Sequence, residues 1–136
     1  MRQIKFRGKD IETGEWIYGD LVQPIGQNPR IYVQDVKTEG AASFFAYDVE
    51  ESTVGQFTGL LDKNGNKIYE GDIVVRHYIE GDVTYICKYE EEYACFAFVT
   101  NIEYGDYNYF QKMDSPKLQI IGNIHDNPEI LKNEER

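Results

Sequence analysis

The segment TVGQFTGLLDKNGNKIYEGDIV, residues Thr53–Val74, decides the fold class because apolar runs alternate in it with residues that favour tight turns. Asn64-Gly65 lies between two such runs, and this pair is typical of a type I′ hairpin turn, which needs positive φ at both positions. A second tight turn is predicted at Gly71-Asp72, where the carboxylate can accept a hydrogen bond from nearby backbone. The segment therefore predicts a hairpin and a following strand, with Asn64, Gly65, Gly71 and Asp72 as the structural turn motif.

The same pattern of short apolar runs and turn residues extends over the rest of the chain. Polar turns are expected at 8–14 and 105–108, a loose segment at 38–42, and a bulge or bend at Gly19, which interrupts an apolar run. Short strands at such spacing indicate a mainly β protein, either a small barrel or two packed antiparallel sheets. The expected strands span residues 4–7, 15–23, 31–36, 44–47, 56–61, 68–69, 73–79, 83–89, 93–99 and 118–122.

Helix signals are confined to two short stretches. Residues 48–54 have the marks of one helical turn, with Asp48 as its cap and acidic residues close behind it. Pro128 suits the first position of a short C-terminal helix over 129–132, capped by Asn127 or Asp126.

Composition limits the class of protein. A chain of 136 residues fits one domain, so a single domain over 1–136 is expected. No apolar run is long enough to cross a bilayer, and the N-terminus lacks the apolar block of a signal peptide, so we expect a cytoplasmic protein without a membrane partner. The 14 basic and 24 acidic residues give a formal charge of −10, which argues against direct nucleic-acid binding.

The two cysteines fall in neighbouring predicted strands. If Glu90-Glu91-Glu92 forms a symmetric three-residue hairpin loop, Cys87 and Cys95 face each other across it. In a cytoplasmic protein we expect both thiols to stay reduced.

The sequence contains no catalytic or metal-binding pattern. His77 and His125 have no partner at ligand spacing. Asp62, Asn64 and Asn66 resemble the first three ligands of a calcium loop, but the glycine falls two positions early and an isoleucine replaces the final glutamate. No nucleophile–base pair and no phosphate loop is present. We therefore expect no catalytic residues, no metal, no cofactor and no enzymatic activity.

Aromatic residues are abundant, with eleven Tyr, seven Phe and one Trp. Many of them will fill the core of a small β protein. Tyr is also favoured at protein interfaces, where its ring packs and its hydroxyl forms hydrogen bonds. A turn region rich in tyrosine and the acidic run 90–92 are therefore taken together as the candidate protein-contact surface, which consists of Tyr104, Tyr107, Tyr109, Glu90, Glu91 and Glu92.

Three blocks of the chain together resemble a known family. They are Ile4–Gly8 with Trp16–Leu21, the central segment Thr53–Val74, and Ile121–Leu131. In this pattern the chain resembles the YopX-like proteins of bacteriophages and prophages. The resemblance implies a phage-derived protein with a core similar to an SH3-type barrel, and a homo-oligomer; it implies no activity. Before the central block this chain has Glu51-Ser52, whereas the family often has a proline.

Three functional hypotheses remain open. The leading one is a phage or prophage accessory protein that acts as a non-catalytic binding or assembly module, self-associates, and contacts a host or phage protein. The second is an acidic decoy that binds a host DNA-binding protein, based on the acidic residues between 70 and 106. The third is a nucleic-acid-binding β-barrel, by analogy with other small barrels.

Overall fold

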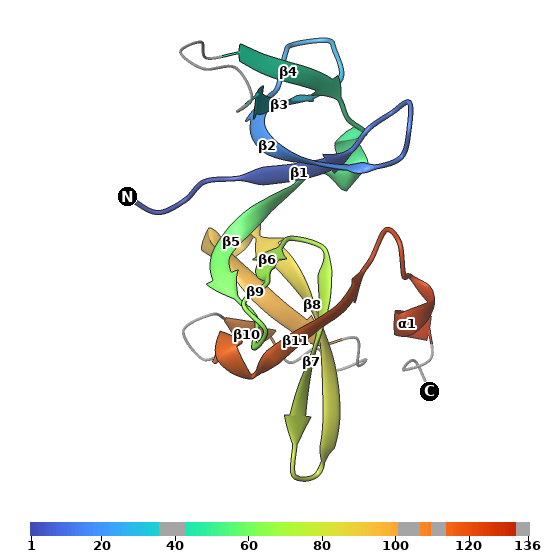
Figure 1. Cartoon of the computed structure of the whole chain (residues 1–136). Coiled ribbons are helices and arrows are strands. Elements are labelled where there is room, and N and C mark those ends of the chain that lie inside the picture. Colours follow the sequence, from blue (N-terminus) through green and yellow to red (C-terminus); the bar gives the residue numbers. More distant parts are fainter. Residues whose placement is uncertain (36–42, 101–106, 110–113, 133–136) are drawn as a thin grey trace. The chain divides into compact units, whose positions relative to one another are not determined.

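The computed structural model describes residues 1–35, 43–100, 107–109 and 114–132, with only the backbone described for 107–109. Its strands form two antiparallel sheets, one in the order β4-β3-β2-β1-β5-β6 and one in the order β10-β9-β8-β7-β11 (Figure 1). The mainly β class and the two-sheet alternative are confirmed. The barrel alternative is wrong, because no ladder within the described residues joins the two outer strands of either sheet.

The chain divides into two compact units, residues 1–57 and 58–136. The single domain expected from length stays a prediction. Strand β5 (Gly55–Leu61) begins in the first unit and ends in the second. The remaining elements of the first unit are β1 (Phe6–Lys9), β2 (Trp16–Val22), β3 (Arg30–Asp35), β4 (Ser43–Asp48) and the 3-10 turn η1 (Glu51–Thr53).

In the first unit, glycines allow neighbouring strands to pack closely around Ile31 and Val49, which are fully buried. A Cβ on Gly19 would lie 2.2 Å from the carbonyl oxygen of Tyr32, a contact that only glycine avoids. Gly19 pairs with Phe6 as the last pair of the β1–β2 ladder, which contains no bulge. The alternative of a bend at Gly19 stays a prediction. β1 continues through Gly8, where a turn was predicted. A Cβ on Gly8 would lie 2.9 Å from the side chain of Val49, so the close approach of Val49 favours glycine there.

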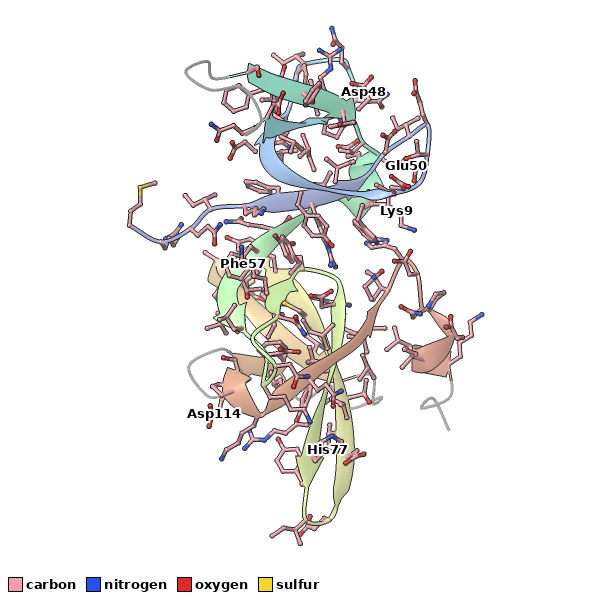
Figure 2. The ribbon with its side chains drawn as sticks, in the orientation of Figure 1. Lys9, Asp48, Glu50, Phe57, His77 and Asp114 are labelled. Carbon is pink, nitrogen blue, oxygen red and sulfur yellow. The ribbon has the colours of Figure 1, made fainter. Side chains whose placement is uncertain are left out.

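The predicted helical turn exists as η1, but its capping differs from the prediction. Asp48 ends β4, and its carboxylate binds Arg30 rather than the turn. Glu50 occupies the N-cap position without a side-chain bond, and Figure 2 labels it together with Lys9. The hydroxyl of Thr53 instead holds the turn: it donates to the Glu50 carbonyl at 2.6 Å and accepts the Lys9 N–H at 2.9 Å.

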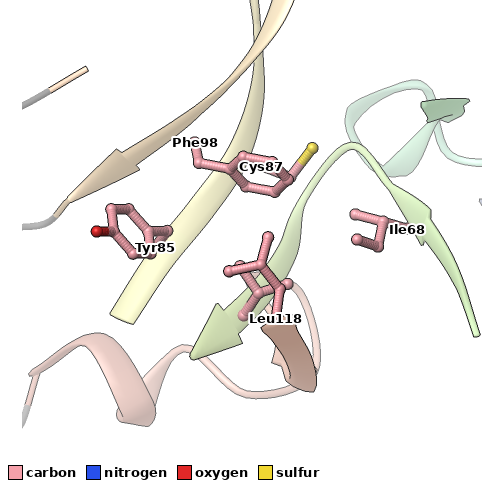
Figure 3. Close-up of a cluster of buried hydrophobic side chains, with 6 residues drawn as sticks. Ile68, Tyr85, Cys87, Phe98 and Leu118 are labelled. Atoms are coloured by element: carbon pink, nitrogen blue, oxygen red, sulfur yellow. The ribbon is translucent and has the colours of Figure 1, made fainter. Parts of the chain in front are cut away.

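The second unit builds its core between the β6 hairpin and the five-stranded sheet. Figure 3 shows the buried cluster, whose members come from strands far apart in the chain: Ile68, Val74, Tyr85, Cys87, Phe98 and Leu118. The ladder of β11 on β7 shifts register between Ile120 and Gly122. The elements are β6 (Lys67–Tyr69), β7 (Asp72–Tyr78), β8 (Gly81–Glu90), η2 (Glu91–Tyr93), β9 (Cys95–Thr100), β10 (Tyr107–Tyr109), η4 (Ser115–Lys117), β11 (Leu118–Asn123) and α1 (Glu129–Lys132).

The hairpin at Asn64-Gly65 forms, but not as a type I′ turn. Gly65 has φ of +80°, whereas Ala94 is the only non-glycine residue with positive φ in the described part of the chain. The N–H of Gly65 donates to the carbonyl of Asp62, and the Asp62 N–H donates to that of Asn66. The loop is therefore one residue longer than predicted, and a longer loop of this kind needs positive φ only at its glycine.

The second tight turn also uses glycine and a carboxylate. Gly71 has φ of +89°, and the buried Asp72 carboxylate accepts the N–H of Tyr69 at 2.8 Å. At the C-terminus, α1 lies where the helix was predicted, and the Asn127 side chain accepts the Asn123 N–H at 3.3 Å. Residues 107 and 108 form part of a strand instead of the predicted turn. Residues 38–42 and 105–106 lie outside the described ranges.

The β8–β9 hairpin corrects the arrangement of the two cysteines. Cys87 pairs with Phe98, and Cys95 pairs with Glu90. The loop holds one residue more than predicted, because Ala94 adopts a left-handed conformation with φ of +50° after η2. That change in register places the two cysteines on opposite faces of the sheet, since side chains alternate along a strand. Neither cysteine forms a disulfide.

Candidate functional site

The sequence-predicted contact surface maps to one end of the five-stranded sheet. Glu90 is the last residue of β8, and Glu91 and Glu92 begin η2. Tyr109 in β10 pairs through its backbone with Ala97, two residues along β9 from the partner of Glu90. The backbone thus brings the acidic turn and the Tyr107–Tyr109 strand close together. Tyr104 lies outside the described residues.

Aromatic side chains that the sequence reasoning missed surround this acidic turn. Tyr93 is 60% exposed, and Tyr89 is exposed beside it in the chain. Tyr89 meets Phe96 edge to face, with ring centroids 5.4 Å apart. Their signal in the sequence was an aromatic residue on each side of the three glutamates. Together these groups suit a partner that offers apolar contacts and positive charge.

The acidic residues between 70 and 106 do not form a row in the part of the chain that the structure describes. Asp72 is buried in its turn. Asp82 binds His77, which Figure 2 labels, at the β7–β8 hairpin. Asp82 and Glu90 lie near opposite ends of β8, roughly 25 Å apart at the usual rise of a strand. The charges are therefore spread over separate places.

A second exposed surface lies on β4, the outer strand of the six-stranded sheet. Phe44 is 51% exposed and Phe45 is 55% exposed, on a strand whose residues 43–47 carry no charge. Sequence reasoning placed these phenylalanines in a strand and did not treat them as a site. The signal was their adjacency: neighbouring side chains on a strand point to opposite faces, so both cannot enter one core.

The end of β4 also borders a polar hollow of about 430 Å³ in the first unit. Arg30 Nε donates to Asp48 Oδ1 at 2.8 Å. That hydrogen bond, together with the charge of Asp48 and a hydrogen bond with Tyr32, raises the pKa of Arg30. Three carboxylates against one guanidinium make the hollow unsuited to an anionic ligand. It holds no histidine, cysteine or serine; its lining is Asp10, Ile11, Glu12, Asn28, Arg30, Ala46, Tyr47 and Asp48.

Other chemistry gains no geometric support among the described residues. They contain no group of three histidine, cysteine or acidic side chains that could hold a metal ion. Of the two cysteines, Cys87 is buried in the core and Cys95 is half-buried. Over the same residues, none of the helices is both long enough and apolar enough to traverse a bilayer.

Comparison with known proteins identifies relatives by sequence and by fold. A family model described as YopX protein matches residues 5–132. Among solved structures, the chain is similar to the crystal structure of protein EF1440 from Enterococcus faecalis, with a TM-score of 0.63 and 24% sequence identity over 96% of this chain and 99% of that one. At this identity the likeness concerns the fold. No functionally curated protein matches the chain.

Proposed function

This chain belongs to the YopX family, and from that premise we propose that it is a phage- or prophage-derived accessory protein, a non-catalytic binding or assembly module that self-associates in the cytoplasm of a host bacterium. The observation that carries the proposal is the exposed aromatic strand β4 at the edge of its sheet, whose residues 43–47 carry no charge. A further host or phage protein is the second partner that the proposal includes.

Edge strands support this proposal for a physical reason. An edge presents unpaired backbone N–H and C=O groups, and natural proteins protect such edges with lysine, proline, bulges or a covering element. Residues 43–47 of β4 contain no lysine and no proline, and their ladder with β3 is regular from Arg30 to Asp35. A strand of this kind is suited to pair with another chain.

The two alternative functions have weaker support. An acidic decoy requires carboxylates arranged along one face, whereas the described acids are buried, paired or far apart. A nucleic-acid-binding protein requires a basic groove, whereas the charged groups that line the hollow beside Arg30 are three carboxylates and one guanidinium. No specific observation favours either one.

Sedimentation velocity of the full chain over a wide range of concentration tests the proposal. We expect the weight-average mass to rise above 15.8 kDa as concentration increases. A chain that sediments as a monomer at every concentration, including the highest that stays in solution, refutes self-association.

A further inference from the structure

The hydrogen bonds at the end of β4 reveal which of its backbone groups face outward. The Asp48 carbonyl accepts the Ile11 N–H at 3.0 Å, from the side opposite β3. The next residue, Val49, donates its N–H to Pro29, on the β3 side. Because these directions alternate along a strand, the N–H and C=O groups of Ala46 and Phe44 face outward as well.

We propose that β4 of a second copy of this chain pairs with these outward groups, antiparallel and about a two-fold axis at Phe45. The inference rests on the proposed self-association and names its surface. In this register Phe44 and Ala46 exchange backbone hydrogen bonds with Ala46 and Phe44 of the partner subunit. Phe45 then meets the partner's Phe45 at a non-hydrogen-bonded position, where Cα atoms come about 4.5 Å apart.

Several features of the strand favour an identical copy as the occupant. The register places a large side chain, Phe44, opposite a small one, Ala46, on one face, and stacks the two Phe45 rings on the other. Residues 43–47 carry no charge, so no like charges meet across the pair. Along the described residues of β4 the contact is also closed. The bond from Ile11 to Asp48 occupies one end of the outer edge, and the two-fold pairing uses the outward groups of Phe44 and Ala46.

The area and charge of the chain set the character of this dimer. A pair of five-residue strands is small compared with stable interfaces, so the dimer will be weak and concentration-dependent. Each copy carries a formal charge of −10, and repulsion between copies opposes their approach. Salt screens that repulsion, so association through β4 strengthens as salt rises.

Three variants of the full chain test the surface in the same sedimentation assay. Phe45→Lys sets two positive charges against each other, and Ala46→Pro removes an outward N–H while leaving the β3 ladder intact. We expect each of these two variants to raise the dimer dissociation constant at least about tenfold, because the first adds charge repulsion and the second leaves a backbone carbonyl of the partner without its donor. Ile79→Lys is the matched control, since Ile79 is fully exposed on the other unit, and it should leave association unchanged. Thermal unfolding checks that each variant is folded.

Phe45→Cys provides a geometric test that does not depend on disrupting the dimer. A Cα separation near 4.5 Å falls within the range of disulfides, so oxidation should join the introduced thiols of the two copies, as peptide mass mapping would show. Ile79→Cys should yield no such link between copies. If the wild type associates but Phe45→Lys and Ala46→Pro do not weaken it and the Phe45→Cys variant forms no link at position 45, the β4 inference is wrong and self-association stands. A monomeric wild type overturns both.

Discussion

Asp62 is the residue whose replacement should most clearly show how this fold is stabilised. Its side chain is 4% exposed and accepts three backbone N–H groups: Asn64 and Asn66 at 2.9 Å, and Ile120 at 3.1 Å. Two of these bonds close the hairpin turn, and the third connects it to β11. Asp62→Asn keeps one oxygen but turns an NH2 group toward the Ile120 N–H. We expect a loss of about 2 kcal/mol in unfolding free energy, and about 4 kcal/mol for Asp62→Ala.

Urea unfolding followed by circular dichroism measures this loss. Glu80→Gln is the matched control, because it neutralises an exposed carboxylate in the same unit, and it should change stability by less than about 0.5 kcal/mol. An Asp62→Asn protein with the same urea midpoint as the wild type would refute the anchoring role.

The pH dependence gives an independent check on the same carboxylate. Burial alone would raise the pKa of Asp62, but the backbone donors of Ile120, Asn66 and Asn64 outweigh it and hold the pKa below its ordinary value of 3.8. The folded state therefore binds this proton less readily than the unfolded state. The stabilisation is complete above the unfolded pKa and disappears as pH falls through the folded value. The difference in unfolding free energy between the wild type and Asp62→Asn should accordingly become smaller below about pH 4. A difference that stays constant down to about pH 2 contradicts this assignment.

Two further predictions follow from close packing and from strand register. Gly19→Ala should lower the unfolding free energy by at least about 2 kcal/mol in thermal or urea unfolding, because its Cβ would overlap a carbonyl oxygen of β3. The control Asp20→Asn, at the next and exposed position, should leave the unfolding free energy unchanged. A Gly19→Ala protein as stable as the wild type would contradict the geometry. Cys95 should react with iodoacetamide in the native state much faster than the buried Cys87, and mild oxidation should form no bond between them, because they lie on opposite faces of the sheet. A monomer that loses the mass of two hydrogens on oxidation would contradict that register.

The strands could be predicted from the sequence because their signals are local. Apolar residues bounded by glycine, asparagine and aspartate located β5, β6 and β7 to within a residue or two. The mistakes came from details that depend on the exact loop. The loop that contains Gly65 is one residue longer than predicted, which changes its turn type. The loop that contains the left-handed Ala94 is also one residue longer, which shifts the β8–β9 pairing. Neither alanine nor a run of glutamates indicates a left-handed position, since this conformation is unusual for both.

Long-range contacts could not be predicted, and they decide the roles of several residues. Asp62 looked like a turn former or part of an incomplete calcium loop, yet one of its oxygens binds a backbone group 58 positions away. Gly19 was predicted to be a bulge or a bend, whereas the need for glycine comes from a carbonyl on the neighbouring strand. The open edges of both sheets likewise depend on which strands meet in space, and the spacing of strands is the same in an open sheet and in a barrel.

The two exposed surfaces differ in charge, and this difference determines what each can bind. A partner at Glu90–Glu92 and Tyr93 would gain from positive charge, so salt would weaken that complex. Pairing through the uncharged residues 43–47 of β4 gains from salt, because salt reduces repulsion between two acidic copies. Self-association and the binding of a basic partner can therefore occur on separate surfaces of one molecule, with opposite salt dependence. The distinctive segment Thr53–Val74 contributes to neither surface directly; its glycines and carboxylates form the turns that hold the strands in place.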